Sequence, residues 1–134
     1  MSKNVKTVLL VDDDNMTNFL HQRVLSKSSI CADVKVAING QEGIQKLIEL
    51  NQVLASKDDT VVVFLDLNMP ILDGWGFLQE YAKNKNNLKF NTKIFVLSSS
   101  INPDDKEKAE ENAHVVQYIY KPLTTSSLQS LQFN

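Results

Sequence analysis

The sequence predicts an α/β fold, in which a parallel five-stranded sheet is covered by helices on both faces. Five short runs rich in apolar residues alternate along the chain with segments whose apolar residues recur at three- and four-residue spacing. Strands that alternate with helices through right-handed crossovers form a parallel sheet with helices on both sides. The chain has 134 residues, of which 43% are hydrophobic, and this length suits one core. We therefore expect residues 1–134 to form a single domain, with no output domain.

The first two strand–helix pairs are expected within the first 55 residues. A dense apolar run at residues 5–11 predicts the first strand, and residues 33–37, which are half polar, predict an outer strand. The helix that begins at Asn15 has the spacing of one buried face. The residues of this face are Met16, Phe19, Leu20 and Val24. The second helix begins at Asn39 and is expected to reach Ala55. Its inner stripe is expected to be Ile44, Leu47 and Ile48.

The central strand is expected at residues 61–65. Five consecutive apolar residues, bounded by polar and turn residues, are typical of a strand that is buried on both faces. Pro70 marks the irregular loop that follows, which ends near Gly74. The third helix comes next. Its inner residues are expected to be Trp75, Leu78 and Ala82, with Phe77 and Tyr81 widening the stripe.

The last two strand–helix pairs complete the pattern. Residues 94–97 and 115–119 predict the fourth and fifth strands, and residues 124–133 predict a short final helix with Leu128 and Leu131 inward. Between these strands, an Asn cap followed by Pro and two acids predicts a helix from Pro103 to about Asn112. The only apolar residues of this helix are Ala109 and Ala113. Little apolar area should therefore hold it to the sheet.

Polar side chains follow four of the five predicted strands. A flavodoxin-like strand order, 2-1-3-4-5, brings the carboxyl ends of these strands to one edge of the sheet, with the switch point between the first and third strands. The residues at these ends are Asp12 and Asp13, Asp66, Ser98 and Lys121. The sequence therefore predicts one site that combines three acids, a hydroxyl and a lysine.

Crowded carboxylates need a cation or raised pKa values, because two like charges about 4 Å apart repel by about 4 kcal/mol at an effective dielectric of ~20. Oxygen ligands at a partly open site favour Mg²⁺. Neither His21 nor His114 is placed for a zinc-type site, and both are expected to be solvated or to pack against helices. One carboxylate of such a cluster can attack a phosphoryl group and form an acyl phosphate.

These strand ends resemble the receiver domain of two-component response regulators, in its stand-alone, CheY-like form. The resemblance covers about residues 5 to 131. The residues that carry it are Val11-Asp12-Asp13, residues 65–70 with Asp73-Gly74, Leu97-Ser98 and residues 118–122. It implies that Asp66 is the phosphoacceptor. It implies that the ligands of Mg²⁺ are Asp13, Asp66, the backbone carbonyl of Asn68 and, through a water molecule, Asp12. The residues that it assigns to phosphoryl binding and switching are Ser98, Lys121 and the rotamer-changing aromatic Tyr118.

The resemblance also implies partners and a mode of action. A sensor histidine kinase or a histidine phosphotransfer protein would supply the phosphoryl group. Its charge would switch the surface formed by the fourth helix, the fifth strand and the fifth helix, and so change the binding of an unidentified downstream protein. The chain would then be a signalling protein in the cytoplasm, a monomer or weak dimer, and not an enzyme beyond its own phosphorylation and dephosphorylation. The Lys121-Pro122 peptide is typically cis in the family.

Two alternatives remain open at this point. Asp66-Leu67-Asn68 loosely resembles the Asp-first loop of haloacid-dehalogenase-type phosphatases, although Asn68 stands where those enzymes carry a second Asp. A degenerate receiver that only binds proteins is the other alternative. The net charge of −2 argues against binding to nucleic acid or an anionic membrane. The single cysteine, Cys31, excludes an internal disulfide and is expected to be a small buried residue.

Overall fold

The computed structural model describes residues 4–28, 30 and 33–131. It contains a five-stranded parallel sheet in the order β2-β1-β3-β4-β5, which confirms the predicted fold. The strands are β1 (Asn4–Val11), β2 (Asp33–Ala37), β3 (Asp59–Leu65), β4 (Asn91–Ser98) and β5 (Val115–Tyr120). The helices are α1 (Asn15–Ser26), α2 (Gly40–Leu50), α3 (Gly74–Asn84), the 3₁₀ turn η1 (Lys85–Asn87), α4 (Pro103–Glu111) and α5 (Thr125–Ser130).

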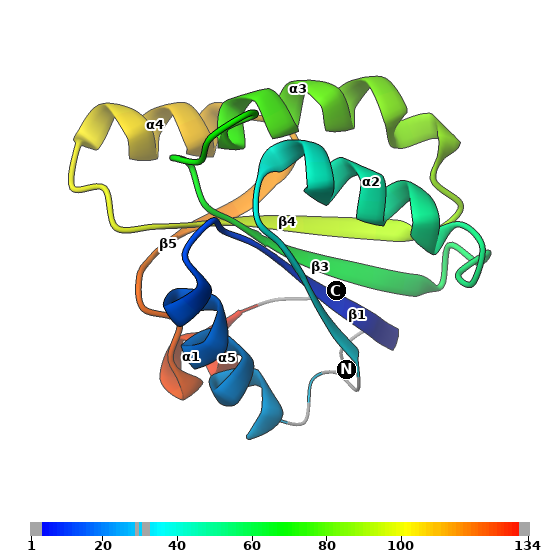
Figure 1. Cartoon of the computed structure of the whole chain (residues 1–134), viewed down its shortest axis with the longest axis horizontal. Helices are drawn as coiled ribbons and strands as arrows, with labels where there is room; N and C mark the ends of the chain where they lie inside the picture. Colours follow the sequence, from blue (N-terminus) through cyan, green and yellow to red (C-terminus); the bar gives the residue numbers. More distant parts are fainter. Residues whose placement is uncertain (1–3, 29, 31–32, 132–134) are drawn as a thin grey trace.

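Helices cover both faces of the sheet. Figure 1 shows α2, α3 and α4 on one face and α1 and α5 on the other. The side chains of β3 alternate between the two sides, as the pleat requires. Val61, Val63 and Leu65 enter the core beneath α2 and α3, whereas Val62 and Phe64 enter the core with Leu128 of α5. The prediction that the central strand is buried on both faces is therefore confirmed. None of the helices in the described ranges is long and apolar enough to cross a membrane.

The predicted inner face of α1 is wrong for three of its four residues. Met16, Phe19 and Leu20 are 63%, 52% and 50% exposed, whereas Val24 is partly buried and packs against the core. The residues that α1 buries are Asn18, His21 and Leu25. Both sets fit a helical spacing, and hydropathy alone selects the more apolar one. Asn18 and His21 each form one hydrogen bond in the interior, through Asn18 Nδ2 and His21 Nε2, which offsets part of the cost of removing them from water. Asn18 Oδ1 has no hydrogen-bond partner among the described residues.

Helices α2 and α3 bury most of the residues that their hydropathy indicates. The predicted inner residues in the core are Ile44, Leu47, Phe77, Leu78 and Tyr81, and Trp75 packs against them. Two predicted inner residues, Ile48 and Ala82, are exposed, and α2 ends at Leu50 rather than Ala55. The buried side of α2 includes Gly43, where an added Cβ atom would lie 3.0 Å from the ring of Phe77. A glycine lets the two helices approach closely, but it carries no apolar side chain that a hydropathy pattern could detect.

Helix α4 is attached as lightly as its sequence predicts. Ala109 is its one buried residue, and Ala113 lies beyond the end of the helix and is exposed. Its start is also as predicted, because the side chain of Asn102 accepts a hydrogen bond from Asp104 N and Pro103 occupies the first turn. The expectations for Cys31 and for residues 132–133 of the final helix lie outside the described residues.

Candidate functional site

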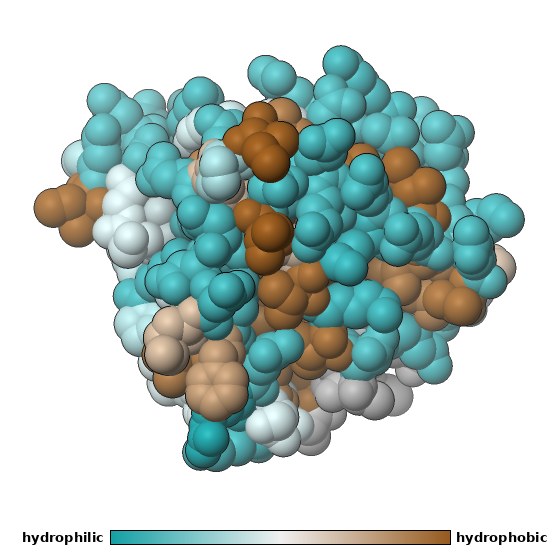
Figure 2. Space-filling view, in the orientation of Figure 1, coloured by the Kyte–Doolittle hydropathy of each residue, from teal (hydrophilic) through white to brown (hydrophobic). Residues whose placement is uncertain are grey.

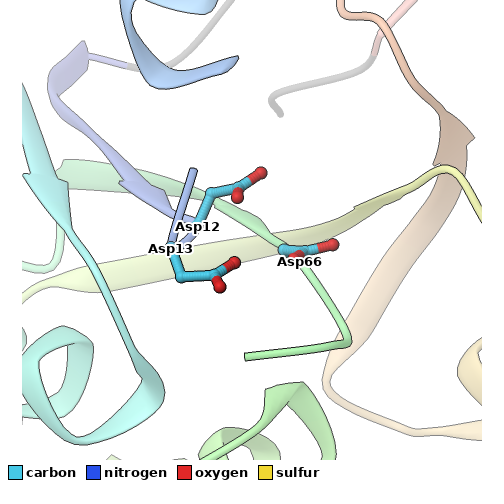
Figure 3. Close-up of side chains that lie close together, drawn as sticks. All are labelled: Asp12, Asp13 and Asp66. Carbon is cyan, nitrogen blue, oxygen red and sulfur yellow. The ribbon is translucent and has the colours of Figure 1, made fainter. Parts of the chain in front are cut away.

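The three carboxylates predicted to meet do lie together. Asp12 and Asp13 follow β1, and Asp66 follows β3. One oxygen atom from each can be chosen so that all three lie within 4.8 Å of one another, and Figure 3 shows these side chains clustered at the ends of the two strands. Backbone hydrogen bonds hold the strand ends in place, since Asp12 N donates to Ala37 O at 3.0 Å and Asp66 N donates to Val11 O at 2.9 Å.

Lys121 connects two of these carboxylates. Its Nζ lies 2.6 Å from Asp12 Oδ2 and 3.3 Å from Asp66 Oδ1. Lys121 follows β5 and precedes a cis peptide bond to Pro122. Its backbone N–H donates to Ser98 O at 2.9 Å, which joins the ends of β4 and β5. The lysine and both carboxylates are largely buried, so their mutual attraction is screened less than at the surface.

Burial and neighbouring charges shift the pKa values of the site. Burial raises the pKa of Asp66, the charge of Asp12 raises it further, and Lys121 partly offsets both. For Lys121, burial acts to lower the pKa, but Asp12 and Asp66 outweigh it and the pKa is raised. Three carboxylates against one ammonium leave excess negative charge at this edge. An all-oxygen donor set with excess negative charge fits a hard divalent cation such as Mg²⁺.

Ser98 and Tyr118 lie on the side of the site that leads to α4. Both side chains are buried. Ser98 Oγ accepts a hydrogen bond from Ser100 N at 3.0 Å, and the hydroxyl of Tyr118 donates to Ser100 O at 3.1 Å. Ser100 Oγ in turn donates to Asp105 Oδ2, in the first turn of α4, at 2.7 Å. A chain of polar contacts therefore runs from the end of β4 to the start of α4.

Two glycines hold the other side of the site at close range. Gly74 N donates to Leu67 O at 2.9 Å, and a Cβ atom added to Gly74 would lie 2.5 Å from Asp66 O. A Cβ atom added to Gly40 would lie 2.6 Å from Leu72 O. Both distances are too short for a real contact, so α2 and α3 can pack against this loop only through glycine. Within the same loop, Ile71 has a φ of 71° and is 78% exposed.

The fold and the strand ends match one protein family. A model of the response regulator receiver domain matches residues 8–131 of the chain. The chain belongs to this family.

This receiver domain is similar to proteins from both plants and bacteria. It is 27% identical to Two-component response regulator 24 of Arabidopsis thaliana over 98% of the chain and 84% of that protein. It is 26% identical to Transcriptional regulatory protein HprR of Escherichia coli over 90% of the chain but only 47% of that protein. The crystal structure of a two component response regulator from Cytophaga hutchinsonii is 30% identical, with a TM-score of 0.78, over 95% of the chain and 93% of that structure.

The structure brings together Asp12, Asp13, Asp66 and Lys121, and it places Ser98 at the neighbouring strand end. Asn68 lies exposed in the loop that follows β3, and its role as a metal ligand stays a prediction.

Sequence reasoning missed two buried residues of α1. Asn18 Nδ2 donates to Asp12 O at 2.8 Å, and His21 Nε2 accepts from Leu123 N at 3.2 Å. Their helical spacing was a usable signal, since Asn18, His21 and Leu25 share one side of α1.

Proposed function

We propose that this receiver domain takes a phosphoryl group onto Asp66 from a histidine kinase or a histidine phosphotransfer protein. The observation that carries the proposal is the position of the Lys121 ammonium, which touches both Asp66 and Asp12 in a cluster of three carboxylates. Phosphoryl transfer needs a nucleophile in line with the phosphorus and positive charge near the phosphoryl oxygens. Membership of a family of two-component signalling proteins supports this assignment.

The transfer step forms one bond and breaks another. An oxygen of Asp66 attacks phosphorus, the bond between phosphorus and the imidazole nitrogen of the donor breaks, and that nitrogen keeps the electron pair. Lys121 Nζ, already beside Asp66 Oδ1, stabilises the charge of the phosphoryl oxygens. The Ser98 hydroxyl is available as a further donor once it turns toward the phosphoryl group. The two residues are held next to each other, because the backbone N–H of Lys121 donates a hydrogen bond to Ser98 O.

Asp13, Asp66 and the backbone carbonyl of Asn68 would hold Mg²⁺, with Asp12 acting through a water molecule. When bound, the ion would neutralise charge on the phosphoryl oxygens and lower the repulsion among the carboxylates. The exposed position of Asp13 supports this assignment, since a side chain open to solvent can bind a largely hydrated cation.

The outer face of α1 supports a protein as the phosphoryl donor. Met16, Phe19 and Leu20 are exposed on this helix, which begins directly after the acidic end of β1. Figure 2 shows hydrophobic surface over the region that α1 occupies. Exposed apolar patches of this kind are typical of protein contacts. A donor that reaches Asp66 from the edge of the sheet would be close enough to cover them.

The output follows from the lightly held α4. Phosphorylation adds about 1.5 to 2 negative charges, which attract Ser98 and Lys121 toward Asp66. A shift at Ser98 passes to Ser100, which is bonded to Tyr118 and to Asp105 of α4. We propose that the surface of α4, β5 and α5 changes with phosphorylation and that a downstream protein binds one of its two forms.

Incubation with Mg²⁺ and acetyl phosphate, followed by measurement of intact mass, tests the proposal. We expect one phosphoryl adduct on the wild type and none on Asp66→Asn. The matched control Asp58→Asn, which changes an exposed acid at the opposite end of β3, should react like the wild type. Sustained hydrolysis of phosphate esters would instead favour the phosphatase, and a wild type that never reacts would favour the degenerate receiver.

A further inference from the structure

The inner face of α1 buries polar side chains while its apolar ones face solvent. Asn18 and His21 are each 3% exposed, and Met16, Phe19 and Leu20 lie outside. Burying an amide and an imidazole is unfavourable unless each is hydrogen-bonded. Places where a sequence breaks its own hydropathy pattern are commonly functional. Both polar side chains form hydrogen bonds to backbone atoms at or near site residues, so their burial can serve to position the site.

We propose that His21 is a positioning residue, which fixes Lys121 by holding the turn that follows β5. His21 Nε2 accepts a hydrogen bond from Leu123 N across 102 residues of sequence. Pro122 has no N–H, so Leu123 carries the first backbone donor after Lys121. On the other side of the turn, Lys121 N donates to Ser98 O. The segment that carries Lys121 is therefore tied to β4 at one end and to α1 at the other.

Helix α1 also holds Asp12, which forms an ion pair with Lys121. One turn before His21, Asn18 Nδ2 donates to Asp12 O, and Asp12 Oδ2 lies 2.6 Å from Lys121 Nζ. Helix α1 thus acts as a rigid spacer between the end of β1 and the turn after β5. The spacing between Asn18 and His21 along α1 therefore sets the position of the Lys121 ammonium relative to the carboxylates.

The protonation of His21 agrees with this role. Burial lowers the pKa of His21, and the nearby charge of Lys121 lowers it further, while Asp12 acts in the opposite direction. A neutral imidazole has one unprotonated nitrogen that can accept a hydrogen bond. With Nε2 as the acceptor, the proton is on Nδ1.

The test compares His21→Leu, His21→Gln and a control on the same side of α1, Leu25→Val. Glutamine can place an amide oxygen where it accepts from Leu123 N, whereas leucine cannot. Leu25 is buried in the same core cluster as Leu123 but takes no part in the hydrogen bond, so its truncation loosens the packing and leaves both bonding atoms in place. The first readout is hydrogen exchange at the backbone amides of Leu123 and Lys121, measured by NMR, because these amides donate to His21 Nε2 and Ser98 O. We expect both amides to lose protection in His21→Leu and to keep it in the other two variants.

The second readout rests on the proposed function, and it is the rate constant for phosphorylation of Asp66 by acetyl phosphate with Mg²⁺. We expect it to fall about tenfold in His21→Leu, to return to within about threefold of the wild type in His21→Gln, and to be unchanged in Leu25→Val. A folded His21→Leu that keeps the wild-type amide protection and rate would overturn the proposal. So would a His21→Gln as slow as His21→Leu.

Two measurements on the wild type test the hydrogen bond directly, without any variant and without phosphorylation. In the wild type, ¹⁵N correlation of the imidazole should identify Nε2 as the unprotonated nitrogen, and the Leu123 amide should be protected from hydrogen exchange. A protonated Nε2 would refute the proposal even if His21→Leu does not fold. If no protein, including the wild type, is phosphorylated, the proposed function is wrong, and hydrogen exchange at Leu123 and Lys121 still decides whether His21 holds the turn that carries the lysine.

Discussion

Helices α1 and α4 both begin in loops at the site edge of the sheet, yet they are attached to it in different ways. Helix α1 buries Leu25 in the core and forms hydrogen bonds through Asn18 and His21 to backbone atoms beside the site. Helix α4 buries only Ala109. The first helix is therefore part of the frame that holds the carboxylates and the lysine. The second is free to change position at little cost in buried area.

In the proposed function, this difference would separate two tasks of a switch. The geometry of the reacting groups would have to survive phosphorylation, which favours a helix that is held by several buried side chains. The surface that reports phosphorylation would have to move, which favours a helix that buries few. The link between the two is the set of hydrogen bonds that joins Ser98 to Ser100, and Ser100 to Tyr118 and Asp105. The following predictions test this division.

The largest effect should come from truncating the buried anchor of α1. Leu25→Ala should lower the free energy of unfolding by about 3 kcal/mol, because it removes a buried side chain and leaves a cavity. In α4, Ala109→Gly should lower it by about 1 kcal/mol, which is the difference in helix propensity between the two residues. Urea unfolding followed by circular dichroism measures both values. Equal losses would mean that α4 is as firmly packed against the sheet as α1.

Amide hydrogen exchange should show the same contrast without a mutation. We expect amides in the middle of α4 to open with a free energy about 2 kcal/mol below that of amides in the middle of α1, because α4 buries one side chain and α1 buries three. Exchange measured by NMR under native conditions gives these energies residue by residue. If the amides of both helices exchange only through global unfolding, α4 is not separately mobile.

A smaller and more local effect is expected from Tyr118→Phe. This change removes the hydroxyl that donates to Ser100 O and keeps the ring in place. Losing one hydrogen bond should lower the opening energy of α4 by about 1 kcal/mol and leave that of α1 unchanged. The rate of Asp66 phosphorylation by acetyl phosphate should also stay at the wild-type value. A slower reaction would show that Tyr118 acts on the site itself rather than on its output.

The smallest effect concerns the cap of α1 and its dependence on pH. The hydroxyl of Thr17 and the backbone N–H of Met16 donate to Asp14, and these bonds lower the pKa of Asp14 below its ordinary value of 3.8. A lowered pKa adds stability above the unfolded value, and this stability is lost as the pH falls through the folded value. The urea midpoint of the wild type should therefore approach that of Asp14→Asn between about pH 5 and about pH 2. A constant difference over that range would contradict it.

The positions of the site residues could be predicted because they depend on topology. Asp12, Asp66 and Lys121 end three different strands, and parallel strands present their carboxyl ends at one edge whatever their side chains are. The central strand was equally predictable, because five consecutive apolar residues at 61–65 fit only a buried element of that length. These inferences need only the order of the strands and the residues at which they end.

The inner face of α1 could not be predicted in the same way, although hydropathy found most inner residues of α2 and α3. This face depends on two hydrogen bonds, from Asn18 Nδ2 to Asp12 O and from Leu123 N to His21 Nε2, and such bonds are set by tertiary structure. The close approach of α2 to α3 depends on Gly43, which contributes contact distance rather than hydrophobicity. Hydropathy measures the transfer of a side chain from water, and it contains neither of these terms.

The two glycine contacts beside Asp66 have a consequence for the direction in which the protein responds. Backbone oxygens of Asp66 and Leu72 lie where Cβ atoms would have to fit at Gly74 and Gly40. Glycine at these two positions therefore brings the backbone of α2 and α3 directly against the loop, with no flexible side chain between them. If Asp66 is phosphorylated as proposed, this side of the site could not move away from the added group. Displacement would then fall to the segment between β4 and α4, and the response of the domain would be one-sided.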